Sequence, residues 1–110
     1  MFGLYQAEWC PYSSAVRERL TELGIDFVAR QVEPWPEDRH ALVEAAGTDE
    51  IPTLDAEGTF YTGTHEIFEF LDRFDPPPFA AQHRARYREH APARLRDAAA
   101  KLLERAAPVR

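Results

Sequence analysis

Apolar residues recur with two different spacings in the N-terminal part of the chain, and each spacing is typical of one kind of secondary structure. Residues 2–5, Phe-Gly-Leu-Tyr, predict a first β-strand. In residues 11–23, Val16, Leu20 and Leu23 recur at the spacing of one helix face. The chain is therefore predicted to begin with a strand, followed by a helix that buries one side.

The next three segments predict a strand, a helix and a hairpin. Residues 26–32 contain alternating apolar positions and predict a second strand. Two prolines then interrupt the chain before a predicted helix from about residue 37 to residue 46, which a glycine closes. Residues 50–54 and 59–61 flank an Ala-Glu-Gly turn, which is typical of a β-hairpin.

A last helix is predicted to start at Thr64, whose hydroxyl is a good N-cap, and to stop at the three prolines of residues 76–78. Its apolar residues fall at the spacing of one buried face: Ile67, Phe70, Leu71 and Phe74. The predicted order β-α-β-α-β-β-α is typical of an α/β fold with a central four-stranded mixed sheet covered by helices on both faces.

The C-terminal part, residues 76–110, is predicted to be a helical extension packed on the same domain as residues 1–75. Spacing suggests a helical turn or two around Phe79, His83 and Tyr87. Pro92 can start a further helix with this apolar stripe: Leu95, Ala99, Leu102, Leu103 and Ala106. Some 30 residues are too few for a second domain, although packing on a second subunit is an alternative.

Composition narrows the class of protein. A chain of 110 residues makes one domain with one modest core, and 45% apolar residues exclude global disorder. The net charge of −6 disfavours nucleic acid and anionic membranes as partners, although arginine-rich stretches lie near the C-terminus. No apolar run reaches the length of a membrane span, and no leader sequence precedes the first strand. We expect a soluble, cytoplasmic protein.

The single cysteine lies where the first strand gives way to the first helix, in the sequence Trp9-Cys10-Pro11-Tyr12-Ser13. A sulfur at a helix N-terminus ionises more readily, because free N–H groups and the helix dipole stabilise the anion. Pro11 suits the first helical position. A buried cysteine acting as a small apolar residue is the alternative, but the polar residues that follow Cys10 favour a reactive thiol. One cysteine allows no internal disulfide, which fits a reducing compartment.

Three segments together resemble the thioredoxin superfamily, and within it the glutaredoxins and the N-terminal domains of glutathione transferases. They are Trp9-Cys10-Pro11-Tyr12-Ser13 after the first strand, Ile51-Pro52-Thr53-Leu54 before the hairpin, and Thr62-Gly63-Thr64-His65-Glu66-Ile67 at the last helix. Each segment alone is a weak signal, but their order and the elements between them are specific. The resemblance covers residues 1–75 and implies a thioredoxin-like fold.

The resemblance also implies functional residues. Cys10 matches the nucleophile of the family, and Pro52 matches a proline that follows a cis peptide bond. The expected ligand-binding residues are Pro11, Tyr12, Ile51, Pro52, Thr64 and Glu66. Among these, Ile51 would pair through its backbone with the bound thiol, and Thr64 and Glu66 would hold a γ-glutamyl group. Without the resemblance, Pro52 would be interpreted as a loop proline and Thr64 as a helix cap.

The resemblance predicts a monothiol enzyme, because Ser13 stands where many glutaredoxins have a second cysteine. Such an enzyme reduces mixed disulfides between proteins and a low-molecular-weight thiol. Glutathione is one candidate thiol. Mycothiol is another, since twelve arginines against one lysine suggest a GC-rich coding sequence. The expected partners are glutathionylated or mycothiolated proteins, and the chain is expected to be a monomer or a homodimer. The alternative is a transferase-like thiol-binding module with little turnover, favoured by Ala7, Glu8 and Glu50.

Charged residues around this site complicate the prediction. A basic residue is missing before Cys10, so the helix end and Arg17 are expected to stabilise the thiolate. Asp49 and Glu50 would disfavour an anionic tripeptide such as glutathione. Either Arg30 or Arg39 could supply the positive charge for its glycyl carboxylate.

No metal is expected. Four histidines, His40, His65, His83 and His90, show no metal spacing with the cysteine. His65 could influence the ionisation of the thiol, because it begins the helix expected to face it. The sequence also differs from the Cys-Gly-Phe-Ser motif of glutaredoxins that bind iron–sulfur clusters.

Overall fold

The computed structural model describes residues 1–90 of the chain, and they form a four-stranded mixed sheet. The strands are β1 (Phe2–Gln6), β2 (Phe27–Gln31), β3 (Thr53–Ala56) and β4 (Thr59–Thr62), in the order β2-β1-β3-β4. β1 and β2 are parallel, whereas β1–β3 and β3–β4 are antiparallel pairs. This confirms the mixed sheet predicted from the sequence.

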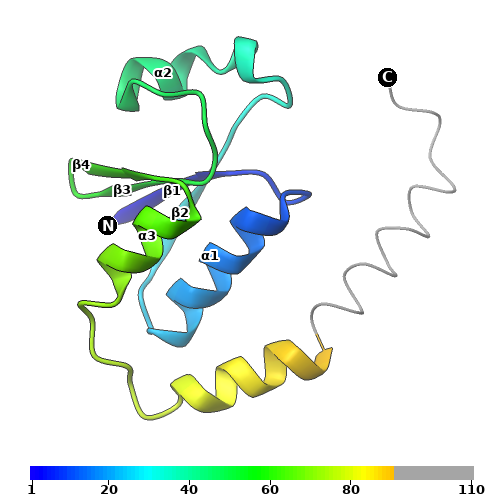
Figure 1. Ribbon diagram of the computed structural model, residues 1–110, viewed down its shortest axis with the longest axis vertical. Coiled ribbons are helices and arrows are strands. Elements are labelled where there is room, and N and C mark those ends of the chain that lie inside the picture. Colours follow the sequence, from blue (N-terminus) through cyan, green and yellow to red (C-terminus); the bar gives the residue numbers. More distant parts are fainter. Residues whose placement is uncertain (91–110) are drawn as a thin grey trace, which may run out of the picture.

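Helices cover both faces of the sheet (Figure 1). α1 (Pro11–Glu22) and α3 (Thr64–Leu71) lie on one face, and α2 (His40–Ala46) lies on the other. A short 3-10 helix, η1 (Pro36–Asp38), precedes α2, and a further helix spans residues 80–90. The predicted flanking helices are thus confirmed.

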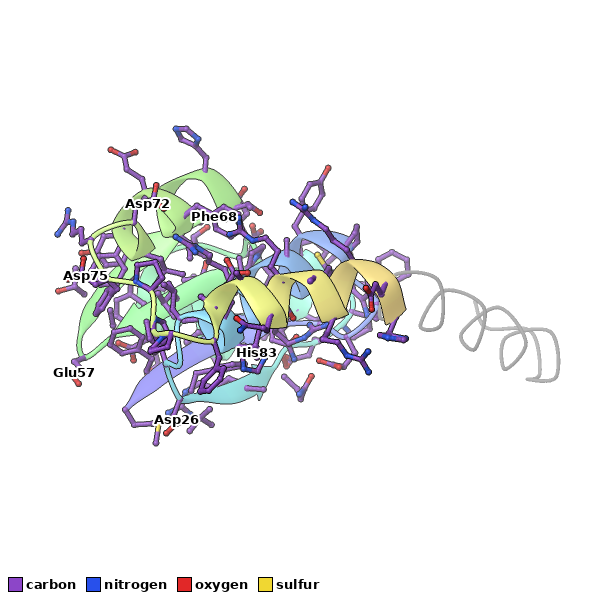
Figure 2. The ribbon with its side chains drawn as sticks, turned by 90° about the horizontal axis from the view of Figure 1, so that it is seen from below. Asp26, Glu57, Phe68, Asp72, Asp75 and His83 are labelled. Carbon is purple, nitrogen blue, oxygen red and sulfur yellow. The ribbon has the colours of Figure 1, made fainter. Side chains whose placement is uncertain are left out.

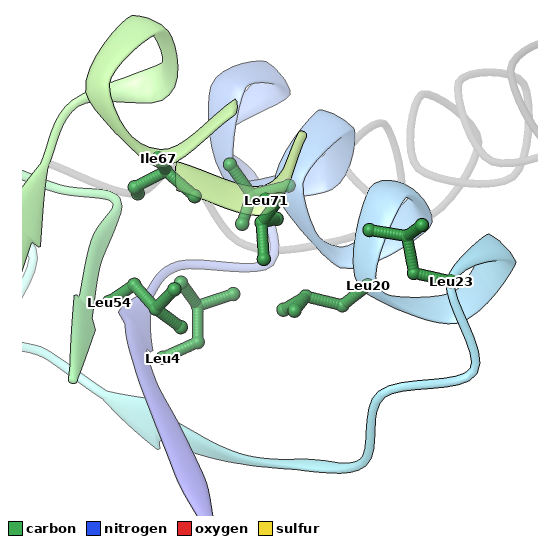
Figure 3. Packing of buried hydrophobic residues seen from close by; sticks show 7 residues of the cluster. Leu4, Leu20, Leu23, Leu54, Ile67 and Leu71 are labelled. Carbon is green, nitrogen blue, oxygen red and sulfur yellow. The ribbon is translucent and has the colours of Figure 1, made fainter. Parts of the chain in front are cut away.

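The core lies between the sheet and the pair α1 and α3 (Figure 3). It consists of Leu4, Val16, Leu20, Leu23, Leu54, Ile67 and Leu71, none more than 6% exposed. Leu4 and Leu54 are directly paired across β1 and β3, so their side chains point to the same face. Each fully buried leucine contributes about 2 kcal/mol through the hydrophobic effect. The helix faces predicted from spacing are the faces that build this core.

The helix predicted over 37–46 is divided into η1 and α2. Arg39 lies between them with φ −83° and ψ 57°, outside the helical region. Its side chain is buried and donates to the backbone carbonyls of Glu33, Pro34 and Asp49 at 2.8–3.0 Å. A regular helix would turn this guanidinium away from those carbonyls, which explains the break. Gly47 closes α2 in the left-handed conformation, as predicted.

The hairpin starts three residues later than predicted, because β3 begins at Thr53, immediately after Pro52. Proline has no N–H to give to a neighbouring strand, so the ladder cannot extend back through it. Residues 50–52 instead form a connection leading into the sheet. The predicted second strand of the hairpin is confirmed, one residue longer, as β4.

The predicted start of the last helix at Thr64 is confirmed, but the capping role of Thr64 and the predicted C-terminal limit are wrong. Gly63 is the N-cap, with φ 86° and ψ 153°, and Thr64 is the first helical residue with no capping hydrogen bond. Gly63 N–H donates to the Pro52 carbonyl at 2.9 Å, and a positive φ there suits glycine alone. The helix ends at Leu71, so Phe74 lies beyond it and is 37% exposed. Phe74 nevertheless packs edge-on against Phe70, with 5.5 Å between ring centroids.

The helix of residues 80–90 runs alongside α1, since it contacts Glu22 at the C-terminal end of α1 and Ser14 in its first turn (Figure 2). Arg84 forms two hydrogen bonds to the buried carboxylate of Glu22, and the hydroxyls of Tyr87 and Ser14 are 3.1 Å apart. The helix predicted from Pro92 lies outside the described residues. Within residues 1–90, no helix is both long and apolar enough to cross a membrane.

Candidate active site

Cys10 is the N-cap of α1, as the strand-to-helix position of this residue predicts. Its sulfur accepts a hydrogen bond from the backbone N–H of Ser13 at 3.4 Å. The α1 N-terminus therefore presents a donor and the positive end of its dipole to the sulfur. This geometry stabilises negative charge on the Cys10 sulfur.

Cys10 is less accessible than the polar helix start suggested. Only 6% of the residue is exposed, so Cys10 is buried, as the alternative to an accessible reactive thiol had it. It is nevertheless not a member of the hydrophobic core cluster. Its neighbours Trp9 and Tyr12 are 66% and 65% exposed, which places the thiol directly beneath the protein surface.

Ser13 holds the loop before the helix and was not predicted to do so. The side chain is fully buried, and its hydroxyl accepts from the Ala7 N–H at 3.4 Å. One serine therefore contributes its own N–H to the sulfur and its hydroxyl to the loop that carries Cys10. A short polar residue three positions after an N-cap was the available sequence signal.

A cavity of about 270 Å³ lies beside the N-terminus of α1. Its lining comes from three separate segments of the chain: Tyr12, Glu50, Ile51, Pro52, Gly63 and Thr64. Four of the predicted ligand-binding residues are therefore brought together. Pro11 and Glu66 are not part of the lining, and Glu50 and Gly63 were not predicted as ligand-binding residues. The Glu66 carboxylate accepts instead from the Thr62 N–H at 3.4 Å.

The cavity wall is shaped by the connection into β3. The Ile51–Pro52 peptide bond is cis, as the family resemblance implied. The Thr53 hydroxyl donates to the Glu50 carbonyl at 2.7 Å, and the Pro52 carbonyl accepts from Gly63 N–H. Across residues 1–90, no hydrogen bond engages the backbone N–H or C=O of Ile51. These two groups are available to an extended ligand.

The arginines expected near the site are engaged elsewhere. Arg17 forms an ion pair with Glu8 at 3.2 Å and a hydrogen bond with Gln6. Arg30 lies over the Tyr5 ring, with 5.9 Å from its guanidinium carbon to the ring centroid. Arg39 is buried with its donors on three carbonyls, so the hypothesis that it binds a ligand carboxylate is wrong.

The histidines and the acidic residues do not converge on a metal site in the described part of the chain. No group of three or more His, Cys, Asp or Glu side chains there could hold a metal ion. His65 is 99% exposed on α3, and its Nε2 lies 4.0 Å from the Glu69 carboxylate.

A cysteine at the N-terminus of α1, a cis-proline directly before β3 and the strand order β2-β1-β3-β4 together define a thioredoxin-like domain. The family model "Glutathione S-transferase, N-terminal domain" matches residues 4–79. The chain therefore belongs to the glutathione S-transferase N-terminal domain family.

Solved structures agree with this assignment. A glutathione S-transferase from Rhodospirillum rubrum F11 is 29% identical, with a TM-score of 0.60, over 71% of this chain and 35% of that one. NrdH-redoxin from Escherichia coli, titled a glutaredoxin-like protein, is 25% identical, with a TM-score of 0.53, over 70% and 97%. A buckwheat glutaredoxin–glutathione complex shares the fold at 17% identity and a TM-score of 0.55, over 66% and 68%.

Two further results bound the comparison. The search of curated proteins found no match. The chain spans less than half the length of the glutathione transferases it matches.

Proposed function

We propose that this protein is a monothiol glutaredoxin-like thiol-disulfide oxidoreductase that acts through Cys10. Its substrates are mixed disulfides between proteins and a low-molecular-weight thiol, either glutathione or mycothiol. The main support is that the Cys10 sulfur caps the N-terminus of α1, the same helix whose Tyr12 lines a cavity together with the cis Ile51–Pro52 segment. Solved relatives that contain glutathione add support, as do the glutaredoxins among them.

The reaction has two exchange steps. The Cys10 thiolate attacks the sulfur of the small thiol in the mixed disulfide, forming a new S–S bond and breaking the old one. The protein substrate leaves as a thiolate and takes a proton from water. A second molecule of the small thiol, as its thiolate, then attacks that same small-thiol sulfur, which releases Cys10 and a symmetric disulfide. The substrate protein is reduced, and one molecule of the small thiol is oxidised, since the sulfur that came from the mixed disulfide stays at the disulfide oxidation level.

The remaining site residues bind and orient the small thiol in this proposal. The free backbone groups of Ile51 pair with its peptide-like part as an added strand would. Pro52 and Tyr12 confine it in the cavity, and Pro11 acts only from outside the lining, as the residue between Cys10 and Tyr12. Thr64 lies at the α3 N-terminus, where N–H groups favour a carboxylate, and Glu66 faces the amine of the same γ-glutamyl group.

A binding module with little turnover is the second candidate. The ion pair between Arg17 and Glu8 and the 6% exposure of Cys10 both favour it. In either case we infer that the protein works in the cytoplasm, as a monomer or a homodimer, since its single cysteine fits a reducing compartment.

The test is a coupled turnover assay with glutathionylated and mycothiolated peptides. Cys10→Ser is expected to lower turnover by at least about 100-fold, because the hydroxyl is a far weaker nucleophile than the thiolate. Thr21→Ala is the control, since it removes a hydroxyl at the other end of α1. Activity that survives Cys10→Ser would refute the proposal. Thiol binding without turnover in the wild type would establish the binding module instead.

A further inference from the structure

The cavity lined by Tyr12 and the cis Ile51–Pro52 segment carries a negative charge that neither the fold nor the proposed reaction requires. Glu50 is the single ionisable side chain, apart from the Tyr12 phenol, in the lining given by residues 1–90. Its carboxylate lies near Gly63, the N-cap of α3, since Oε1 would be 3.8 Å from a Cβ built on that residue. The carboxylate therefore faces the start of α3 and offsets the positive end of that helix.

No described cation cancels this charge within the cavity. The arginines from adjacent segments, Arg17 and Arg39, are engaged with Glu8 and with backbone carbonyls. His65, at the start of α3, is 99% exposed and lies beside Glu69 rather than in the lining. A ligand that enters the cavity thus meets a carboxylate.

Negative charge also gathers on the segment after β2, which Arg39 holds beside the segment that carries Glu50. β1 and β2 are parallel with Gln6 opposite Gln31, so the segments that follow both strands leave the same edge of the sheet (Figure 1). These segments carry the exposed indoles of Trp9 and Trp35, which are 66% and 59% exposed. The segment after β2 and the segment before Pro52 also carry exposed carboxylates: Glu33, Glu37, Asp38 and Asp49. The carboxylate of Glu8 is paired with Arg17 and adds little to this charge.

Exposed indole faces and carboxylates together bind cations. Ammonium and guanidinium groups are attracted to the face of a tryptophan ring, and carboxylates add Coulomb attraction. An anionic group would be repelled at the same surface. At about 6 Å in water, one unit charge changes an association constant about threefold.

We propose that Glu50 and this surface select protein substrates that carry lysine or arginine next to the mixed disulfide. The inference rests on the proposed function, because it assigns a substrate class to the same site. The cationic flanks of the substrate would lie on the surface around Trp9 and Trp35 while the disulfide reaches Cys10.

The experiment compares three glutathionylated peptides that differ only in the two residues flanking the modified cysteine: Lys, Gln or Glu. The single-turnover rate of peptide release is measured with the full-length protein at low salt. Each rate is divided by the rate with dithiothreitol, which removes differences in the intrinsic reactivity of the disulfides. The lysine peptide is expected to react about tenfold faster than the glutamate peptide, and added salt should reduce that ratio.

Two variants locate the source of the preference. Glu50→Gln is expected to reduce the lysine-to-glutamate ratio about two- to threefold. Asp26→Asn removes a carboxylate from the other end of β2, far from the cavity, and should leave the ratio unchanged (Figure 2). A wild-type ratio of one or less would overturn the proposal. Equal effects of both variants would do the same.

A second readout separates this proposal from the proposed function. Alkylation of Cys10 by neutral iodoacetamide and anionic iodoacetate, each normalised to free cysteine, requires no disulfide exchange. A wild-type preference for iodoacetamide that Glu50→Gln weakens supports the charge selection even where no peptide is reduced. Absence of that preference overturns the charge selection even where peptides are reduced.

Discussion

Arg39 carries a charged group into the protein interior and uses it to hold two loop segments together, residues 33–34 and residue 49. Its donors are bonded to the carbonyls of Glu33, Pro34 and Asp49, and only 5% of the residue is exposed. These three bonds are partly buried, so water replaces the lost donor only in part, which costs more than the bonds themselves contribute. Arg39 therefore fixes the backbone position of Asp49, which directly precedes the segment that carries Glu50 and Pro52.

Arg39→Ala is expected to destabilise the protein by about 2–4 kcal/mol, because three carbonyls lose their donor. Arg39→Lys should recover only part of the loss, since an ammonium group cannot reproduce the planar fork. The measurement is urea unfolding followed by circular dichroism. Arg30→Ala is the control, because Arg30 lies exposed over Tyr5. A loss of stability for Arg39→Ala no larger than that of the control would contradict this role.

Gly63 shows how one backbone angle connects the hairpin to the site. A residue with a side chain would be strained there by the φ of 86°. The strain would not come from crowding, because a Cβ would meet only Glu50 Oε1, at 3.8 Å. Gly63→Ala should therefore destabilise the protein by about 1–2 kcal/mol and weaken thiol binding, because the bond to the Pro52 carbonyl depends on this conformation. Calorimetry of thiol binding and urea unfolding measure the two effects. Unchanged stability in this variant would show that the strain is absent.

Among the elements, α1 and α3 are held to the sheet by a shared set of leucine and isoleucine side chains. Leu20 lies at the centre of the α1 face and is fully buried (Figure 3). Leu20→Ala is expected to cost about 2–5 kcal/mol, through lost burial and the cavity left behind. Val28→Ala on β2 is a matched control that should cost much less, since Val28 is 44% exposed. Similar midpoints of urea unfolding in the two variants would argue against this packing.

The elements could be predicted well from the sequence, because spacing over a few residues reports directly on strand and helix faces. The prediction failed where distant residues intervene. The break before α2 depends on carbonyls at residues 33, 34 and 49 that bond to Arg39, and the start of α3 depends on the bond between Gly63 and Pro52. Local spacing carries no information about either contact.

For the whole molecule, the contact between α1 and the helix of residues 80–90 depends on pH. Burial raises the pKa of Glu22, but hydrogen bonds from Arg84 and Arg19 outweigh it and hold the pKa below the usual 4.5. A carboxylate with a lowered pKa stabilises the folded state above about pH 4.5, and this contribution is lost as the pH falls through the folded-state value. The neighbouring Glu18 acts in the opposite direction, because burial and the charge of Glu22 raise its pKa.

We therefore expect the wild type to lose stability below pH 4.5 more steeply than Glu22→Gln does. The variant should be less stable at pH 7, because it lacks the charged partner of Arg84 and Arg19. Its stability should fall less between pH 5 and pH 3.5, because the amide does not titrate. Arg84→Ala should also reduce that fall, since it removes one of the groups that lower the pKa of Glu22. Urea unfolding at pH 3.5, 5 and 7 measures this. Parallel pH profiles for wild type and Glu22→Gln would refute the assignment.

The amino-acid sequence alone is enough to identify the strands, the helix faces, the position of Cys10 at a helix start and the three family segments. Each of these features depends on residues that lie close together along the chain. Folding places Glu50 in the cavity, commits Arg17 and Arg39 to other partners, and covers most of Cys10. Those features depend on side chains that meet across distant segments, and their charge and burial exist only once the chain has folded.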